Sequence, residues 1–293
     1  MKKILYILIP ALALWNCSPK EQPGESHLVV EAWIESGGHP MVTVSESIGV
    51  TTGAYIDAGS LVNHLARWAK VSVSDGEKTV VLTGMASEET FPPYVFTSSE
   101  ITGEPGKTYS LKVEYKDYVA TAQTVIPAPV PIDTLYIRVV ADSLGTIMCG
   151  FTDPEAPGNY YKLFTRTRDK DRRFHPSALA QTSDENLSGY TEMFLYSTQR
   201  LMDYVDMPNI REGDEVEVKL CTMTPEIFRF WERFESILAS NVVDMRPTGD
   251  INALSNMNGA YGYWAGYGVD SEAGVKTIVV KDPKPETEPL PSY

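Results

Sequence analysis

Short stretches in which apolar and polar residues alternate dominate the first half of the sequence. Such alternation has the period of a β-strand, whose successive side chains point to opposite faces. Gly, Pro or Asp separates most of the stretches, and the pairs Gly37-Gly38 and Asp75-Gly76 suit the tight turns of hairpins. The stretches cover residues 28–34, 41–47, 69–74, 79–83, 94–97, 108–115 and 118–125. This pattern predicts a β-sandwich of the Ig-like or transthyretin-like kind over residues 27–126.

The alternation stops at a proline-rich segment and resumes beyond it. Prolines at 127, 129 and 131 remove backbone donors and stiffen the chain. We therefore expect a linker at residues 127–132, a second β-rich domain at 133–281 and a Pro-rich C-terminal tail at 282–293. Further alternating stretches lie at residues 134–140, 145–152, 160–168, 190–196 and 214–222. The predicted fold class is mainly β.

One segment carries helical rather than strand periodicity. Thr224 can cap a helix, Pro225 suits its first position, and apolar residues recur at spacings of three and four. These apolar residues are Ile227, Phe230, Trp231, Phe234, Ile237 and Leu238. The pattern predicts an amphipathic helix near residues 225–239 that packs on a sheet. A helix lying on a membrane surface is disfavoured because acidic residues outnumber basic ones on its polar side.

The N-terminus has the pattern of an export signal. Two lysines precede an apolar run that is too short to cross a bilayer and that ends just before Cys17. The segment Leu14-Trp15-Asn16-Cys17 resembles a lipobox, although Trp15 and Asn16 occupy positions where small residues are usual. We expect a signal peptide at residues 1–16, lipidation of Cys17 and a lipidated tether at 17–26. The alternative is a plain signal peptide that ends in an incidental cysteine.

Charge and cysteine content limit the partners and the chemistry. The net charge of −14 makes nucleic acid an unfavourable partner, and an acidic body would depend on the acyl chains for membrane attachment. Cys149 and Cys221 remain once Cys17 is assigned to lipid. A disulfide between them is allowed outside the cytoplasm, but their strand positions favour two separate, unreactive thiols.

The sequence has none of the common catalytic or cofactor-binding motifs. It lacks GxSxG, Walker, HExxH, CxxC and dinucleotide fingerprints, and its four histidines are scattered. Asp169 and Asp171 resemble part of a calcium loop, but no glycine turn or bidentate glutamate follows them. We predict no catalytic residue, no metal site and no cofactor. A hydrolase whose site is assembled only by folding stays open as an alternative.

Residues 256–268 combine glycines with aromatic residues. Glycine lets a backbone approach a ligand closely, and Tyr and Trp offer rigid stacking surfaces. The candidate ligand-binding residues are Tyr261, Tyr263, Trp264 and Tyr267. The competing interpretation is a closing strand whose glycines permit tight crossings while the rings pack. Strand alternation would place Trp264 on the face opposite Tyr261, Tyr263 and Tyr267, so we expect mixed roles.

Several motifs, taken in order, resemble a family of Bacteroidota lipoproteins of unknown function. The motifs lie at residues 28–34, 40–44, 121–127, 151–154, 159–161 and 256–268. The resemblance implies attachment to the outer membrane and a partner role beside a TonB-dependent receptor, because such proteins are commonly encoded next to these receptors. It supplies no catalytic residues. The expected function is non-catalytic binding of a ligand or of the receptor during nutrient uptake. A structural or adhesive surface module is the alternative.

Overall fold

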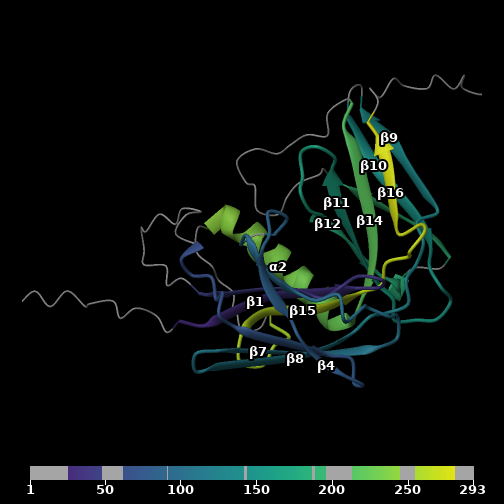
Figure 1. Cartoon of the computed structure of the whole chain (residues 1–293). Helices are drawn as coiled ribbons and strands as arrows, with labels where there is room; N and C mark the ends of the chain where they lie inside the picture. Colours follow the sequence, from purple (N-terminus) through teal and green to yellow (C-terminus); the bar gives the residue numbers. More distant parts are fainter. Residues whose placement is uncertain are drawn as a thin grey trace, which may run out of the picture.

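A computed structural model describes residues 26–47, 62–90, 92–141, 144–186, 189–195, 213–244 and 255–280. The predicted signal peptide, Cys17, nearly all of the predicted tether and the predicted C-terminal tail lie outside these residues. The described chain is mainly β, as the alternation predicts, and it forms two sandwiches with one long helix between them (Figure 1).

The first sandwich comes mostly from the N-terminal half of the chain. Its two sheets have the orders β15-β1-β2-β6-β5 and β4-β3-β7-β8. Apolar side chains that alternate along β1, β3, β7 and β8 fill the space between the sheets. The strands are β1 (Leu28–Glu35), β2 (Met41–Glu46), β3 (Lys70–Ser74), β4 (Thr79–Val81), β5 (Thr83–Ala86), β6 (Tyr94–Thr97), β7 (Thr108–Tyr115) and β8 (Tyr118–Val125).

Strand β15 (Tyr261–Tyr267) corrects the expected domain organisation. It belongs to the first sandwich, where it pairs in parallel with β1, although its sequence position suggests the second domain. Met257 and Trp264 are part of the first core. The prediction that residues 133–281 form a separate domain is therefore wrong for the segment around β15. A parallel partner so distant in sequence leaves no local signal, because register is set by packing rather than by a turn.

The second sandwich packs a three-stranded sheet on a four-stranded one. The sheet orders are β13-β10-β9 and β12-β11-β14-β16, and their inward side chains form a second core. The expected linker leads into this sandwich, and Val130 and Ile132 are buried in its core. The strands are β9 (Thr134–Ala141), β10 (Leu144–Thr152), β11 (Tyr160–Thr167), β12 (His175–Ser183), β13 (Tyr190–Leu195), β14 (Glu215–Met223) and β16 (Val275–Val279), with a short 3-10 helix η1 (Asp184–Asn186).

Helix α2 (Pro225–Asp244) lies in the angle between the two sandwiches (Figure 1). It begins at the predicted proline and runs beyond the predicted end. A third apolar cluster joins its inner side to the outer faces of both sandwiches, through Phe164 and Met223 on one side and Tyr263 and Tyr267 on the other. The helix therefore connects the two sandwiches by packing on both.

A buried ion pair fastens α2 to the second sandwich. Lys162 on β11 donates to a carboxylate oxygen of Glu235 on α2 at 2.7 Å, and both side chains are almost fully enclosed. The second Glu235 oxygen accepts from the backbone N–H of Leu179, where β12 bulges and Leu179 has a φ of 55°. Burial lowers the pKa of Lys162, and Glu235 opposes that shift.

Candidate functional site

The glycines of the glycine-aromatic segment are required by close backbone approach. A Cβ on Gly262, which has a φ of +108°, would lie 1.8 Å from the carbonyl oxygen of Val30 on β1. A Cβ on Gly266 would lie 2.3 Å from the carbonyl oxygen of Val125 on β8. Both distances are far below van der Waals contact. The glycines therefore allow β15 to close one side of the first sandwich, as the packing interpretation expects.

Trp264 points into the first core. It is fully buried, and its indole N–H donates to the carbonyl oxygen of Tyr109 at 2.9 Å. The side chain of Asn256 fixes the local backbone, since it accepts from Trp264 N at 2.9 Å and donates to Trp264 O at 3.0 Å. The candidate role of Trp264 in ligand binding is wrong for this reason.

Tyr263 and Tyr267 occupy the opposite face of β15 and pack against α2. The indole N–H of Trp231 donates to the Tyr267 hydroxyl at 3.0 Å, and the Tyr263 hydroxyl donates to Glu31 at 3.0 Å. Burial raises the pKa of both phenols well above the usual value. These two tyrosines are buried in the junction between α2 and the first sandwich, so their candidate role as ligand-contacting residues is also wrong. The predicted separation of Trp264 from them is confirmed.

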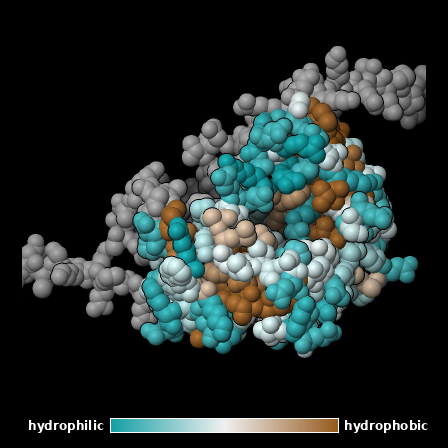
Figure 2. Space-filling model, in the orientation of Figure 1, coloured by the Kyte–Doolittle hydropathy of each residue, from teal (hydrophilic) through white to brown (hydrophobic). Residues whose placement is uncertain are grey.

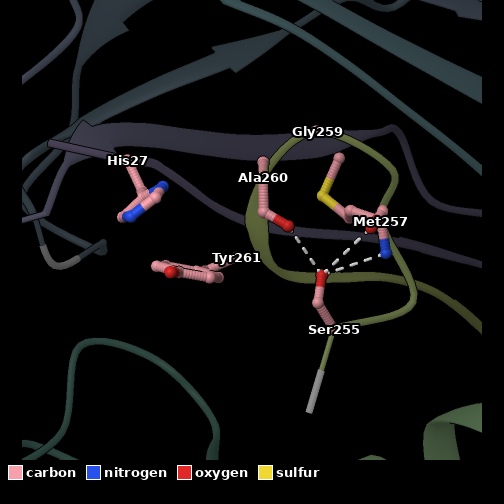
Figure 3. Close-up of a pocket in the computed structure, with 6 residues that line it drawn as sticks. All are labelled: His27, Ser255, Met257, Gly259, Ala260 and Tyr261. Atoms are coloured by element: carbon pink, nitrogen blue, oxygen red, sulfur yellow. Dashed lines mark hydrogen bonds between the residues drawn. The ribbon is translucent and has the colours of Figure 1, made fainter. Parts of the chain in front are cut away.

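Tyr261 differs from the other three because it borders a pocket of about 290 Å³. The rings of His27 and Tyr261 lie on one side of this pocket, and Ser255, Met257 and Ala260 lie on the other (Figure 3). The two ring centroids are 4.6 Å apart with the planes tilted by 50°. Gly259 completes the lining.

Hydrogen bonds within the loop shape the far side of the pocket. The Ser255 hydroxyl donates to the carbonyl oxygen of Ala260 at 2.9 Å and accepts from Met257 N at 3.0 Å (Figure 3). The pocket thus combines a phenol, an imidazole and a thioether around a loop held by its own hydrogen bonds. Such a lining suits a small ligand with an apolar face and a few polar groups.

Sequence reasoning identified Tyr261 but missed His27 as its neighbour. His27 precedes the first strand, and the two rings meet only because β1 and β15 pair in parallel. An isolated histidine outside any motif carries no signal for such a contact. Met257 lies within residues 256–268 and Ser255 directly before them, but neither carries the aromatic ring by which the candidate residues were chosen.

Glu31 on β1 is a partly buried carboxylate beside the tyrosines that pack against α2. Glu31 accepts from the Tyr263 hydroxyl, and burial raises its pKa while the charge of Arg173 acts in the opposite direction. The raised pKa marks Glu31 as a group whose charge is costly in the folded chain.

Both remaining cysteines are free thiols in different cores. Cys149 belongs to the core of the second sandwich, whereas Cys221 lies in the cluster around α2. Burial raises the pKa of Cys149 to about 12 and that of Cys221 further. The expectation of two separate cysteines is confirmed, and thiols with raised pKa values are weak nucleophiles at neutral pH.

The described residues contain no group of metal-binding side chains and no membrane-spanning helix. No cluster of three or more His, Cys, Asp or Glu side chains is arranged there to hold a metal ion. None of the helices in this part of the chain is long and apolar enough to cross a membrane. On the face shown in Figure 2, hydrophobic residues form small separate groups among hydrophilic ones.

The fold and the pocket define a mainly β protein with two sandwiches and a small cavity beside its first strand. Residues 17–273 match the profile of one family, described as "Domain of unknown function (DUF4249)". The chain belongs to this family, whose match covers the first sandwich, α2 and every strand of the second sandwich except β16. A comparison with curated proteins finds no match.

Among solved structures, the similarities are distant. The chicken CNTN1 FN1-FN3 domains match with 13% identity and a TM-score of 0.25, covering 89% of this chain and 64% of that one. A cytokine receptor complex matches with 8% identity and a TM-score of 0.21, covering 67% of this chain and 84% of that one. This chain thus spans less than two thirds of the CNTN1 fragment.

Proposed function

We propose that this protein is a non-catalytic lipoprotein of the outer membrane that binds a small ligand beside Tyr261 and assists a TonB-dependent receptor in its uptake. The observation that carries the proposal is the pocket of about 290 Å³ that the His27 and Tyr261 rings line on one side. Of the four candidate aromatic residues, Tyr261 is the one that packs neither in the core of the first sandwich nor against α2. The lipobox-like segment at Cys17 supports lipid attachment, on either face of the outer membrane.

The position of the pocket suits a tethered binding protein. His27 is one of the first described residues, and its backbone is held to the end of β2 because Ser47 N donates to His27 O at 2.7 Å. The pocket therefore lies next to the point where the predicted tether joins the body. A ligand bound there would stay close to the membrane and to a receptor embedded in it.

Ligand binding is tested with the purified protein and a panel of oligosaccharides, catechol-type chelators and short peptides. These classes match the stacking and hydrogen-bonding groups of the pocket. We expect one class to raise the melting temperature of the wild type, and Tyr261→Ala and His27→Ala to weaken that binding at least about tenfold, which is about 1.4 kcal/mol. Tyr136→Ala, on the second sandwich, is the matched control. Equal effects of all three variants, or no binding by the wild type, would contradict the pocket assignment.

The receptor and anchor are tested separately in membranes. We expect the wild type to sediment with outer membranes and to copurify with a TonB-dependent receptor encoded beside its gene, and Cys17→Ala to lose sedimentation. Copurification without any loss on Cys17→Ala would remove the lipid anchor from the proposal. Attachment of cells to surfaces that depends on the protein but not on Tyr261 would favour the adhesive alternative.

A further inference from the structure

The described chain begins at Ser26, at one end of the first sandwich. We call this end the entry end. It comprises Ser26, the β7–β8 turn at residues 115–118 and a turn at residues 66–69. The Tyr118 hydroxyl donates to the carbonyl oxygen of Ser26 at 2.7 Å. Lys116 forms an ion pair with Glu46, the last residue of β2. These contacts place the β7–β8 turn beside the point where the chain enters the sandwich.

The turn at residues 66–69 belongs to the same end. Ala66 N donates to Val44 O on β2 at 3.0 Å, and Ala69 N donates to Ala66 O at 3.0 Å, which closes the turn. Arg67 and Trp68 are its two central residues. The side of the turn toward the core is buried at Ala66, whereas Trp68 is 91% exposed.

Such exposure is unusual for the largest apolar side chain. Tryptophan is highly buried on average in folded proteins, and an indole fully in water forgoes the burial of a large apolar area. At a membrane surface, by contrast, Trp and Tyr are favoured because their rings combine an apolar body with a polar edge. The exposed indole is therefore suited to the interfacial layer of a bilayer.

Charge at the entry end permits contact with a bilayer despite the acidic chain. The exposed cations Lys70 and Lys116 have acidic neighbours, Glu114 at 3.8 Å for Lys70 and Glu46 for Lys116. Arg67 is also exposed and lies over the ring of Tyr94 at 5.8 Å. The carboxylates of Glu46, Glu114 and the exposed Asp117 match the three cations in number, so the net charge of −14 is not concentrated at the entry end.

We propose that the entry end rests on the bilayer and that Trp68 inserts into its interfacial layer. The inference rests on the proposed lipid anchor at Cys17. Ser26 follows Cys17 by nine residues, so the tether reaches roughly 30 Å at most. A short tether of this kind gives the entry end an effective concentration near the surface in the millimolar range, which makes a weak contact sufficient. Docking in this way presents the ligand pocket toward the membrane plane.

The test uses the lipidated protein, purified from membranes and reconstituted into phosphatidylcholine vesicles with or without bromine on the acyl chains near the headgroup. Bromine quenches only indoles that enter the bilayer. The emission of Trp68 is obtained as the difference between the wild type and Trp68→Phe. We expect that this difference shifts to shorter wavelength in plain vesicles and is largely lost in brominated ones.

Trp33→Phe is the matched control, because Trp33 packs in the cluster around α2, away from the entry end. This variant should retain the quenching. Protein that sediments with the vesicles but shows equal Trp68 emission in both would overturn docking while leaving the anchor intact. Failure of the wild type to sediment would overturn the anchor and, with it, the docking. A spectral shift that needs added receptor would assign Trp68 to a protein contact and also overturn the proposal.

Discussion

Two glycines with similar backbone conformations differ in what surrounds them. Gly262 has a φ of +108° and faces Val30 O, whereas Gly76 has a φ of +89° and nothing within 4 Å of the position that a Cβ would take. Gly76→Ala should cost about 1 kcal/mol of stability from backbone strain alone. Gly262→Ala should cost at least about 3 kcal/mol, because β15 must also move away from β1. Chemical denaturation measures both, and equal losses would show that β15 adjusts freely.

The buried pair Lys162–Glu235 predicts strong coupling between two residues. Removing one partner by Lys162→Met or Glu235→Leu leaves the other charge buried and unpaired, at a cost of about 3–5 kcal/mol. The double variant should lose much less than the sum, because an apolar pair replaces an ionic one. The free energies of unfolding of the four proteins form the cycle. Additive losses would mean that solvent reaches the pair in the folded chain.

Glu31 predicts a pH dependence with a defined sign. Its pKa is raised above the ordinary 4.5, with burial as the main cause. A carboxyl with a higher pKa in the folded than in the unfolded chain contributes stability that is complete below the unfolded pKa and is lost as pH rises through the folded pKa. Glu31→Gln keeps an acceptor for Tyr263 and cannot ionise. Between about pH 4 and about pH 7, unfolding free energies of the variant should therefore fall less, or rise more, than those of the wild type. Parallel curves would contradict the assignment.

At the scale of elements, α2 connects the two sandwiches through its aromatic side. Trp231 is buried and bonds to Tyr267 on β15. Trp231→Ala should cost about 3–5 kcal/mol, whereas Glu232→Ala on the exposed side should change stability by no more than about 0.5 kcal/mol. Thermal and chemical denaturation measure both. A loss under about 1 kcal/mol for Trp231→Ala would assign this side of α2 to a partner instead.

Local patterns explain why the elements could be predicted from sequence. The alternation at 28–34 and 118–125 matches β1 and β8 to within one residue, since inward and outward positions differ in polarity there. The start of α2 was identified from Thr224 and Pro225. Its end was not, because no glycine or proline cap follows residue 239.

Contacts between distant segments explain what the sequence could not predict. The β1–β15 pairing, the Lys162–Glu235 pair and the His27–Tyr261 pocket all join residues with no shared local pattern. Of the residues that line the pocket, the sequence therefore predicted only Tyr261 as a candidate. Trp68 carries no such signal either, since the sequence of a short turn does not reveal how far a tryptophan in it is exposed.

At the scale of the whole molecule, the first sandwich should not fold from its own half of the chain. A fragment of residues 26–131 lacks Met257 and Trp264, which belong to its core, and leaves β1 without its parallel partner. We expect this fragment to show no cooperative unfolding transition, because loss of a buried Trp alone removes about 3–5 kcal/mol from a total of about 5–15 kcal/mol. Circular dichroism during urea titration measures this.

Adding a peptide of residues 255–268 should restore the transition if the missing strand is the cause. A scrambled peptide of the same composition is the control. A fragment that unfolds cooperatively without the peptide would show that β15 completes a core that is already stable.

The parallel pairing of β1 with β15 also sets an order in time. Glu31 and Tyr263 are 232 residues apart, so at about 5–20 residues per second a ribosome needs roughly 10–50 s between them. During that interval one edge of β1 lacks its partner strand β15, and the strands of the second sandwich are still being synthesised. The core of the first sandwich therefore cannot close before β15 has been made, and we expect resistance to proteases only after that point.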